Sequence, residues 1–134
     1  LTRTMELFEQ HIFGDQRGKL ISIEERTDVP FSIKRTFFIY DVPHDQTRGE
    51  HAHVKTKQYI SALSGSCKIT LDSGNELRTY SLDSPNIGLF QDTLVWGKMF
   101  DFSCDCILLV LASERYDPED YIVNYDKFLE VLAR

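Results

Sequence analysis

Short segments in which apolar and polar residues alternate dominate the chain. Between residues 66 and 72, Cys67, Ile69 and Leu71 alternate with polar residues, which is the two-residue period of a strand with one buried face. Similar segments bounded by turn residues predict strands at 19–24, 35–41, 57–63, 66–72, 76–82, 86–90, 93–97 and 106–112. Many short strands at close intervals predict an antiparallel barrel or sandwich.

Two turns predict how neighbouring strands connect. Ser64-Gly65 is expected to join 57–63 and 66–72 as a strand pair. The run Asp72-Ser73-Gly74-Asn75 is typical of a tight hairpin turn leading into 76–82.

One helical segment is expected near the C-terminal end of the chain. Asp117 is a suitable N-cap, Pro118 suits the first helical position, and the acidic residues that follow suit the positive end of a helix. Apolar residues then recur at helical spacing, with a break expected near Asp126. They are Tyr121, Ile122, Tyr125, Phe128, Leu129 and Leu132.

Two of the predicted strands are apolar on both faces. They are Phe37 to Tyr40 and Ile107 to Leu111. One face of each can line the core, but the other face also needs cover, because monomers rarely expose large apolar patches. A second copy of the chain is the simplest cover, so we expect a homodimer.

Composition narrows the class of protein. A length of 134 residues predicts a single domain over residues 1–134, and the 42% hydrophobic content is enough for a core and excludes a disordered chain. The net charge of −6 argues against binding to nucleic acid or to an anionic membrane, and no apolar run is long enough to span a bilayer. Three cysteines cannot form a complete set of disulfides, so we expect reduced thiols and a cytoplasmic location.

Candidate chemistry centres on His51-Ala52-His53. In an extended segment both imidazoles point to the same face, about 6.6 Å apart along the strand. Such a pair suits proton transfer or metal binding, although two ordinary histidines would show the same pattern. Arg48, Lys55 and Lys57 lie nearby, and cations beside proton-transfer groups suit a phosphorylated or carbonyl substrate.

The segment Gly49 to His53, followed by Gln58 and Gly65, resembles the first motif of the cupins. Metal-dependent cupins carry a glutamate where this chain has Gln58, and a histidine in a second motif where it has Gly97. Two histidines without a carboxylate make a poor catalytic metal site, so no metal is expected.

A closer resemblance spans nearly the whole chain and is to the sugar 3,4-ketoisomerases, which are metal-free cupins acting on dTDP-4-keto-6-deoxyglucose. The segments that carry it are 17–20, 23–25, 30–35, 48–53, 63–67, 82–85, 110–113 and 116–117. The resemblance implies an all-β cupin fold, a double-stranded β-helix or jelly-roll barrel with a short C-terminal helical segment. It also implies an isomerase without a cofactor, acting on a dTDP-linked keto-sugar whose product goes to an aminotransferase in deoxysugar biosynthesis.

For that reaction the two histidines divide the proton transfers. We assign His53 as the base at carbon and His51 as the shuttle between the sugar oxygens, with the opposite division left open. Arg35 and Arg48 are candidates for the pyrophosphate, because guanidinium binds phosphate oxygens in pairs. Trp96 and Tyr40 can contact thymine or sugar, although aromatic residues on strands pack in cores more often.

Arg17 and Gly97 bear on the stereochemistry of the product. Ketoisomerases that form the galacto product have arginine at the position of Arg17 and histidine at the position of Gly97. This chain keeps the first and lacks the second. The resemblance therefore favours Arg17 as a substrate-binding residue and, weakly, dTDP-3-keto-6-deoxygalactose as the product.

Two other functions share most of these features. A nucleotide-sugar 3,5-epimerase also removes a proton beside a carbonyl in a metal-free cupin, but such chains are usually longer. A sugar-binding cupin without catalysis would tolerate loss of the histidines, so the intact pair favours an enzyme.

Overall fold

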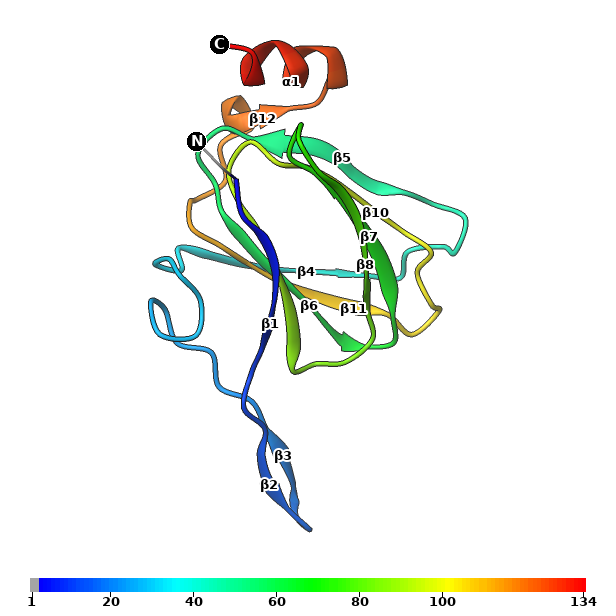
Figure 1. The fold of residues 1–134 in the computed structure, drawn as a ribbon. Coiled ribbons are helices and arrows are strands. Elements are labelled where there is room, and N and C mark those ends of the chain that lie inside the picture. The colour runs from blue at the N-terminus through cyan, green and yellow to red at the C-terminus, as the bar shows by residue number, and fades with distance from the viewer. Residues whose placement is uncertain (1–2) are drawn as a thin grey trace.

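Two five-stranded antiparallel sheets face each other in the computed structural model, which describes residues 3–134 (Figure 1). In order, the first sheet contains β1 (Met5–Glu9), β9 (Ile87–Gln91), β6 (Gln58–Ser64), β11 (Ile107–Ala112) and β4 (Arg35–Tyr40). The second contains β12 (Tyr121–Ile122), β5 (Arg48–His53), β10 (Trp96–Phe100), β7 (Cys67–Asp72) and β8 (Leu77–Leu82). The predicted all-β barrel is confirmed.

The core lies between the two sheets. Alternate residues of each strand point inward, so that Ile60 and Val110 of the first sheet share one cluster with Ile69 and Leu71 of the second. All four of these side chains are fully buried, and burial of each stabilises the fold by roughly 1.5–3 kcal/mol. The alternation predicted for residues 66–72 is confirmed, because Cys67, Ile69 and Leu71 are buried.

The predicted pairing of 57–63 with 66–72 is wrong. The turn at Ser64-Gly65 carries the chain from β6 in the first sheet to β7 in the second. Gly65 has a φ of +65°, and a Cβ there would come within 2.7 Å of the Cys106 backbone nitrogen, so this crossing requires glycine. The hairpin predicted at 72–75 is confirmed, because β7 pairs with β8 through Asp72 and Leu77.

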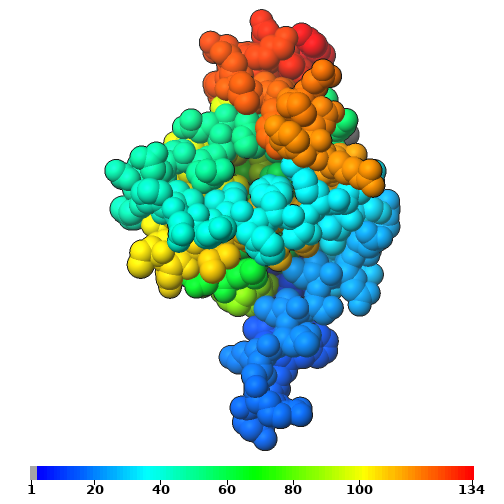
Figure 2. Space-filling view, turned by 180° about the vertical axis from the view of Figure 1, so that it is seen from behind, coloured from blue at the N-terminus to red at the C-terminus, as the bar shows by residue number. Residues whose placement is uncertain are grey.

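The predicted strand 19–24 is shorter than expected. Only β3 (Gly18–Leu20) forms, and it pairs with β2 (Phe13–Asp15) in an exposed hairpin. This hairpin projects from the barrel at the end opposite β12 (Figures 1 and 2). The chain that follows it instead covers part of the outer face of the first sheet, where Val29 and Phe31 pack near Tyr59.

The strand predicted at 93–97 is displaced to 96–100. Residues 92–95 turn between β9 and β10, and Leu94 there has a φ of +56°, which a continuing strand would not allow.

The helical segment predicted from Asp117, with a break near Asp126, is also wrong in extent. Asp117 does cap a turn, because its side chain accepts a hydrogen bond from the Glu119 N–H, but that 3₁₀ turn ends at Asp120. Residues 121 and 122 then form β12, which pairs with β5. The α-helix α1 (Tyr125–Leu132) begins only after a second cap, Asn124, whose side chain accepts from the Lys127 N–H.

The outer face of β4 and its neighbours is apolar and uncovered in one chain. Phe38 and Tyr40 of β4 are 57% and 64% exposed, and Leu63 of β6 and Ile107 of β11 are 44% and 38% exposed. We call these four residues the outer strip.

None of the helices within residues 3–134 combines the length and apolarity that crossing a bilayer needs.

Candidate active site

At one end of the barrel the inward-facing residues change from apolar to polar. Gln91, Gln58 and Arg35 lie in one row across the first sheet, on strands β9, β6 and β4. They lie two positions along from Leu89, Ile60 and Phe37, so they point to the same inner face. Both glutamines are buried. The row therefore forms a polar wall above the core.

The two histidines project toward that wall from the second sheet. His51 lies opposite Gly97, which lies opposite the core residue Leu71, so His51 points inward. A register shift in the β5–β10 pair occurs at Gly49 and Glu50, which both have positive φ. The ring centroids of His51 and His53 are 4.9 Å apart with the rings nearly perpendicular. The predicted placement of both imidazoles on one face is confirmed.

Tyr121 closes the site on the side of β12. It pairs with His53 in the β12–β5 ladder, and its ring centroid lies 4.5 Å from that of His53 and 5.0 Å from that of His51. Its ring therefore removes water from the neighbourhood of both imidazoles.

This burial sets the protonation state of the histidines. Burial is the largest cause that lowers the pKa of His53; nearby His51 and Arg35 add to it and Asp120 opposes it, and together they bring this pKa to about 4. Burial also lowers the pKa of His51, and Arg48 adds to that effect. His53 Nε2 is buried without a hydrogen-bond partner in the described chain. Both imidazoles are thus neutral at neutral pH, and His53 has an unused nitrogen available for a ligand or a proton.

Arg35 is the predicted cation whose charge acts on His53. Its guanidinium carbon lies 5.1 Å from the Phe37 ring centroid and 5.7 Å from that of Tyr116, whose ring in turn lies 5.9 Å from that of Tyr121. Its Nε is buried without a hydrogen-bond partner among the described residues. Arg48 is more exposed and influences the site through its charge next to His51.

Three other predicted residues lie away from the histidines in one chain. Trp96 packs under α1, with its ring centroid 5.3 Å from that of Tyr125 and 5.6 Å from that of Phe128, which matches core packing. Tyr40 belongs to the outer strip and points away from the barrel interior. Arg17 lies at the exposed turn of the β2–β3 hairpin, where it forms an ion pair with Asp15 at 2.7 Å.

Comparisons with known proteins decide the family. The family model FdtA, described as WxcM-like, C-terminal, matches residues 3–133. The TDP-4-oxo-6-deoxy-alpha-D-glucose-3,4-oxoisomerase of Aneurinibacillus thermoaerophilus is 48% identical over 120 residues, which are 90% of this chain and 86% of the relative. This chain belongs to the sugar 3,4-ketoisomerase family. The resemblance inferred from the sequence segments is confirmed, and with it an isomerase activity.

Solved structures agree with this family. The ketoisomerase QdtA from Thermoanaerobacterium thermosaccharolyticum, crystallised as a histidine-to-asparagine mutant in complex with TDP-4-keto-6-deoxyglucose, matches with a TM-score of 0.92. It is 43% identical, and the match covers 95% of this chain and 92% of QdtA. The dTDP-4-dehydrorhamnose 3,5-epimerase of Bacillus anthracis has a TM-score of 0.77 at 16% identity, covering 87% and 76% of the two chains. That epimerase shares the fold.

Asp120 and Tyr121 are the functional candidates that the sequence pattern missed. Both fall in the stretch predicted to be helical, before the break expected near Asp126, so neither could be placed beside His53. Asp120 is buried, and it accepts hydrogen bonds from the Lys55 N–H at 2.7 Å and from the Thr56 hydroxyl.

The residues around the two histidines do not fit a metal ion in this member of the family. Gln58 brings a neutral amide to the inner wall, Gly97 brings no side chain, and the positive charge of Arg35 acts on His53. Across residues 3–134, no group of three or more His, Cys, Asp or Glu side chains is arranged to hold a metal.

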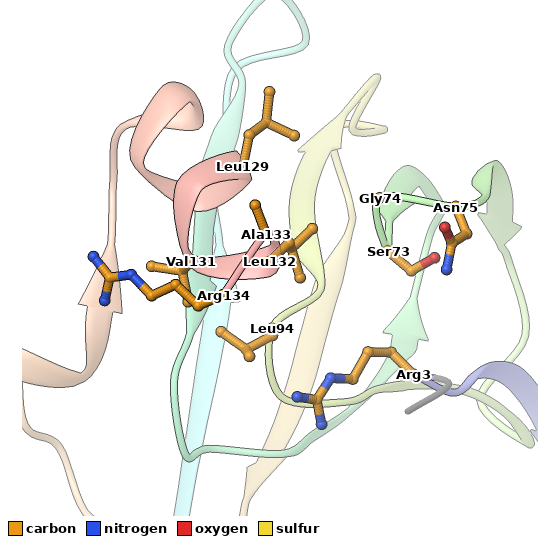
Figure 3. Close-up of a pocket in the computed structure, with 10 residues that line it drawn as sticks. All are labelled: Arg3, Ser73, Gly74, Asn75, Leu94, Leu129, Val131, Leu132, Ala133 and Arg134. Atoms are coloured by element: carbon orange, nitrogen blue, oxygen red, sulfur yellow. The ribbon is translucent and has the colours of Figure 1, made fainter.

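A separate cavity of about 460 Å³ lies between α1, the β7–β8 turn and Leu94 (Figure 3). Leu129 and Leu132 line one side, and Ser73 to Asn75 line the other. It contains neither histidine, so we assign it no part in the reaction.

Proposed function

We propose that the enzyme converts dTDP-4-keto-6-deoxyglucose to a dTDP-3-keto-6-deoxyhexose. The observation that carries this proposal is the pair of neutral imidazoles on one face, half-buried His51 and buried His53, of which His53 has an unpartnered nitrogen. Family membership supports it, because the curated relative acts on TDP-4-oxo-6-deoxy-glucose according to its name. Neutral imidazole is the form that accepts a proton from carbon.

In the proposed reaction His53 removes the proton from C3, which the C4 carbonyl makes acidic. The electron pair of the C3–H bond forms the C3=C4 bond of an enediolate, and the C4 carbonyl pair moves to its oxygen. His51 transfers a proton from the C3 oxygen to the C4 oxygen. The His53 imidazolium then gives a proton to C4, the electron pair of the C3=C4 bond forms the C4–H bond, and an electron pair of the C3 oxygen forms the C3 carbonyl. Oxidation and reduction occur within one molecule, so the balance needs no cofactor, and the charge of Arg35 favours the anionic intermediate.

The nucleotide end of the substrate needs cations at the edge of the site. We assign Arg35 and Arg48 to the pyrophosphate, since each acts on one of the two histidines through its charge. A hollow of about 520 Å³ beside Tyr116 is lined by three cations and two carboxylates: Lys34, Lys55, Arg115, Glu114 and Asp117. Lys34 pairs with Glu114 and Lys55 with Asp117, so the charge that the hollow adds near Arg35 is that of Arg115. Trp96 stays a predicted substrate contact, less well supported because its ring packs under α1.

A homodimer would account for the residues that one chain leaves outside the site. The outer strip is apolar and exposed, so a second copy that covers it gains burial. In such a dimer Arg17 on the projecting hairpin and Tyr40 on the outer strip can serve the neighbouring subunit's site. We retain the galacto product, which the arginine at position 17 favours. Free Cys67, Cys104 and Cys106 support a cytoplasmic location.

Incubation with dTDP-4-keto-6-deoxyglucose in deuterated water tests the reaction. NMR of the product should show a ketone at C3 and deuterium at C4, and the configuration at C4 distinguishes galacto from gluco. Deuterium at C3 and C5 with the ketone still at C4 would indicate a 3,5-epimerase instead. No incorporation would refute both enzymatic functions and favour a sugar-binding protein.

Sedimentation analysis tests the dimer. Phe38→Asp places a charge in the outer strip and should convert dimers to monomers, whereas Val123→Asp at another exposed site, 73% exposed, should not. A monomeric wild type would contradict the proposal.

Subunit mixing tests the place of Arg17. Inactive Arg17→Ala chains mixed with inactive His53→Asn chains should regain activity in mixed dimers, because one site then holds both residues. Mixed dimers without activity would show that Arg17 does not act across the interface.

A further inference from the structure

Asp120 is the one buried carboxylate among residues 3–134, with 4% of its surface exposed. Two groups donate hydrogen bonds to its carboxylate, and both are neutral: the Lys55 backbone N–H and the Thr56 hydroxyl. Within the described chain no Lys, Arg or His nitrogen lies within 4.0 Å of it, and the Lys55 ammonium binds Asp117 at 3.0 Å instead. A buried anion without a counter-ion is costly, so its retention calls for an explanation.

The backbone fixes Asp120 beside the catalytic strand. The Val54 N–H donates to the Asp120 carbonyl at 3.0 Å, and the next residue, Tyr121, pairs with His53. Residues 54–56, which directly follow His53, are therefore bonded to Asp120 through both its backbone carbonyl and its side chain.

The titratable groups that act on His53 come from three elements. His51 lies on the same strand, Arg35 on β4, and Asp120 at the end of the 3₁₀ turn; Tyr121 is an uncharged neighbour. His51 and Arg35 oppose a positive charge on His53, and Asp120 is the one neighbour that favours it. The Lys55 ammonium also interacts with the charge of Asp120, but it forms an exposed ion pair with Asp117, where solvent weakens that interaction.

We propose that Asp120 is a positioning residue whose fixed negative charge stabilises the imidazolium formed when His53 takes the carbon-bound proton. The inference rests on the proposed role of His53. In the resting enzyme no cation within the described residues lies within 4.0 Å of the carboxylate, and proton transfer creates one at His53, on which Asp120 acts through its charge. The pinned carboxylate needs no rearrangement, since its two hydrogen bonds already hold it in place.

Asp120→Asn tests the charge without removing the shape. The amide has nearly the same shape and can still form hydrogen bonds with the Lys55 N–H and the Thr56 hydroxyl. We expect kcat to fall about 10- to 100-fold, because a fixed charge that favours a developing charge stabilises the transition state, with KM changed less than about threefold. Loss of a negative charge makes the imidazolium less stable, so the acid limb of the kcat/KM profile should move to lower pH.

Thr56→Val is the matched control, because it removes one hydrogen bond to Asp120 and keeps the charge. Thermal unfolding should show a comparable loss of stability in both variants, while Thr56→Val keeps kcat within about threefold. If Thr56→Val loses as much kcat as Asp120→Asn, or if Asp120→Asn keeps the wild-type rate and acid limb, the proposal is overturned.

NMR titration of the His53 ring separates this inference from the proposed reaction, since it needs no turnover. The His53 signal is identified by its absence in His53→Asn. A lower His53 pKa in Asp120→Asn supports the electrostatic role even if the sugar nucleotide is not a substrate. An unchanged His53 pKa would refute it even if the ketoisomerase activity is demonstrated.

Discussion

Burial of the His53 imidazole predicts that acidification weakens the fold by a calculable amount. The unfolded chain binds a proton at His53 with the ordinary pKa of 6.5, whereas the folded chain does so only at a pKa of about 4. As the pH falls below about 6.5, the unfolded state therefore takes up a proton that the folded state does not. Stability contributed by neutral His53 is complete above that pH and is lost progressively as the pH falls to about 4.

The size of the effect follows from the two pKa values. Their difference corresponds to about 3 kcal/mol when the whole interval is crossed, and to about 2 kcal/mol between pH 8 and pH 5. Other groups also titrate over this range, so the prediction concerns the difference between wild type and His53→Asn. The variant lacks this proton uptake, and its free energy of unfolding should fall by about 2 kcal/mol less over the same interval.

Urea unfolding at a series of pH values measures the difference. His11→Asn is the matched control, because it removes an exposed histidine that lies outside the site. If wild type and His53→Asn lose stability in parallel from pH 8 to pH 5, the imidazole is not held neutral by its surroundings. The mechanism that assigns a neutral base to His53 would then fail as well.

Three further predictions address the site. Replacing either His51 or His53 by Asn should lower turnover by about two orders of magnitude or more, measured with the deuterium assay; near-normal rates in both would contradict the catalytic assignment. Chelator should leave activity intact, and loss of turnover restored by added metal would show that a metal takes part. A Cβ at Gly97 would lie 2.6 Å from Gln91 Nε2, so Gly97→His should lower the melting temperature. Adding Gln91→Ala to that variant should restore part of the loss. Equal melting temperatures of the single and double variants would refute this crowding.

The strands and the histidine pair could be predicted because both depend on local pattern. Alternation in 66–72 and the i, i+2 spacing of His51 and His53 fix which face a side chain occupies, whatever lies opposite. The hairpin at 72–75 was predictable for the same reason. The number of domains and the cytoplasmic location stay predictions.

Errors arose where contacts between distant segments override the local pattern. The spacing of Tyr121 and Ile122 suits a helix, but pairing with His53 and Ala52 makes them a strand. The turn at Ser64-Gly65 suits a hairpin, but it changes sheets because both sheets must supply strands to one barrel. Asp120 could not be recognised for the same reason, since its role depends on a neighbour 67 positions earlier in the chain.

The position of β12 explains why the C-terminal helix matters to a site built mainly on β5. A two-residue strand is too short to hold its place by ladder hydrogen bonds alone. The cluster beneath it supplies the missing stability, because fully buried Phe128 of α1 packs with Ile122 of β12 and Ala52 of β5. Burial of Phe128 contributes roughly 1.5–3 kcal/mol, enough to hold Asp120 and Tyr121 against His53. It is therefore consistent that the family match extends to residue 133, through the helix, and does not end at the last long strand.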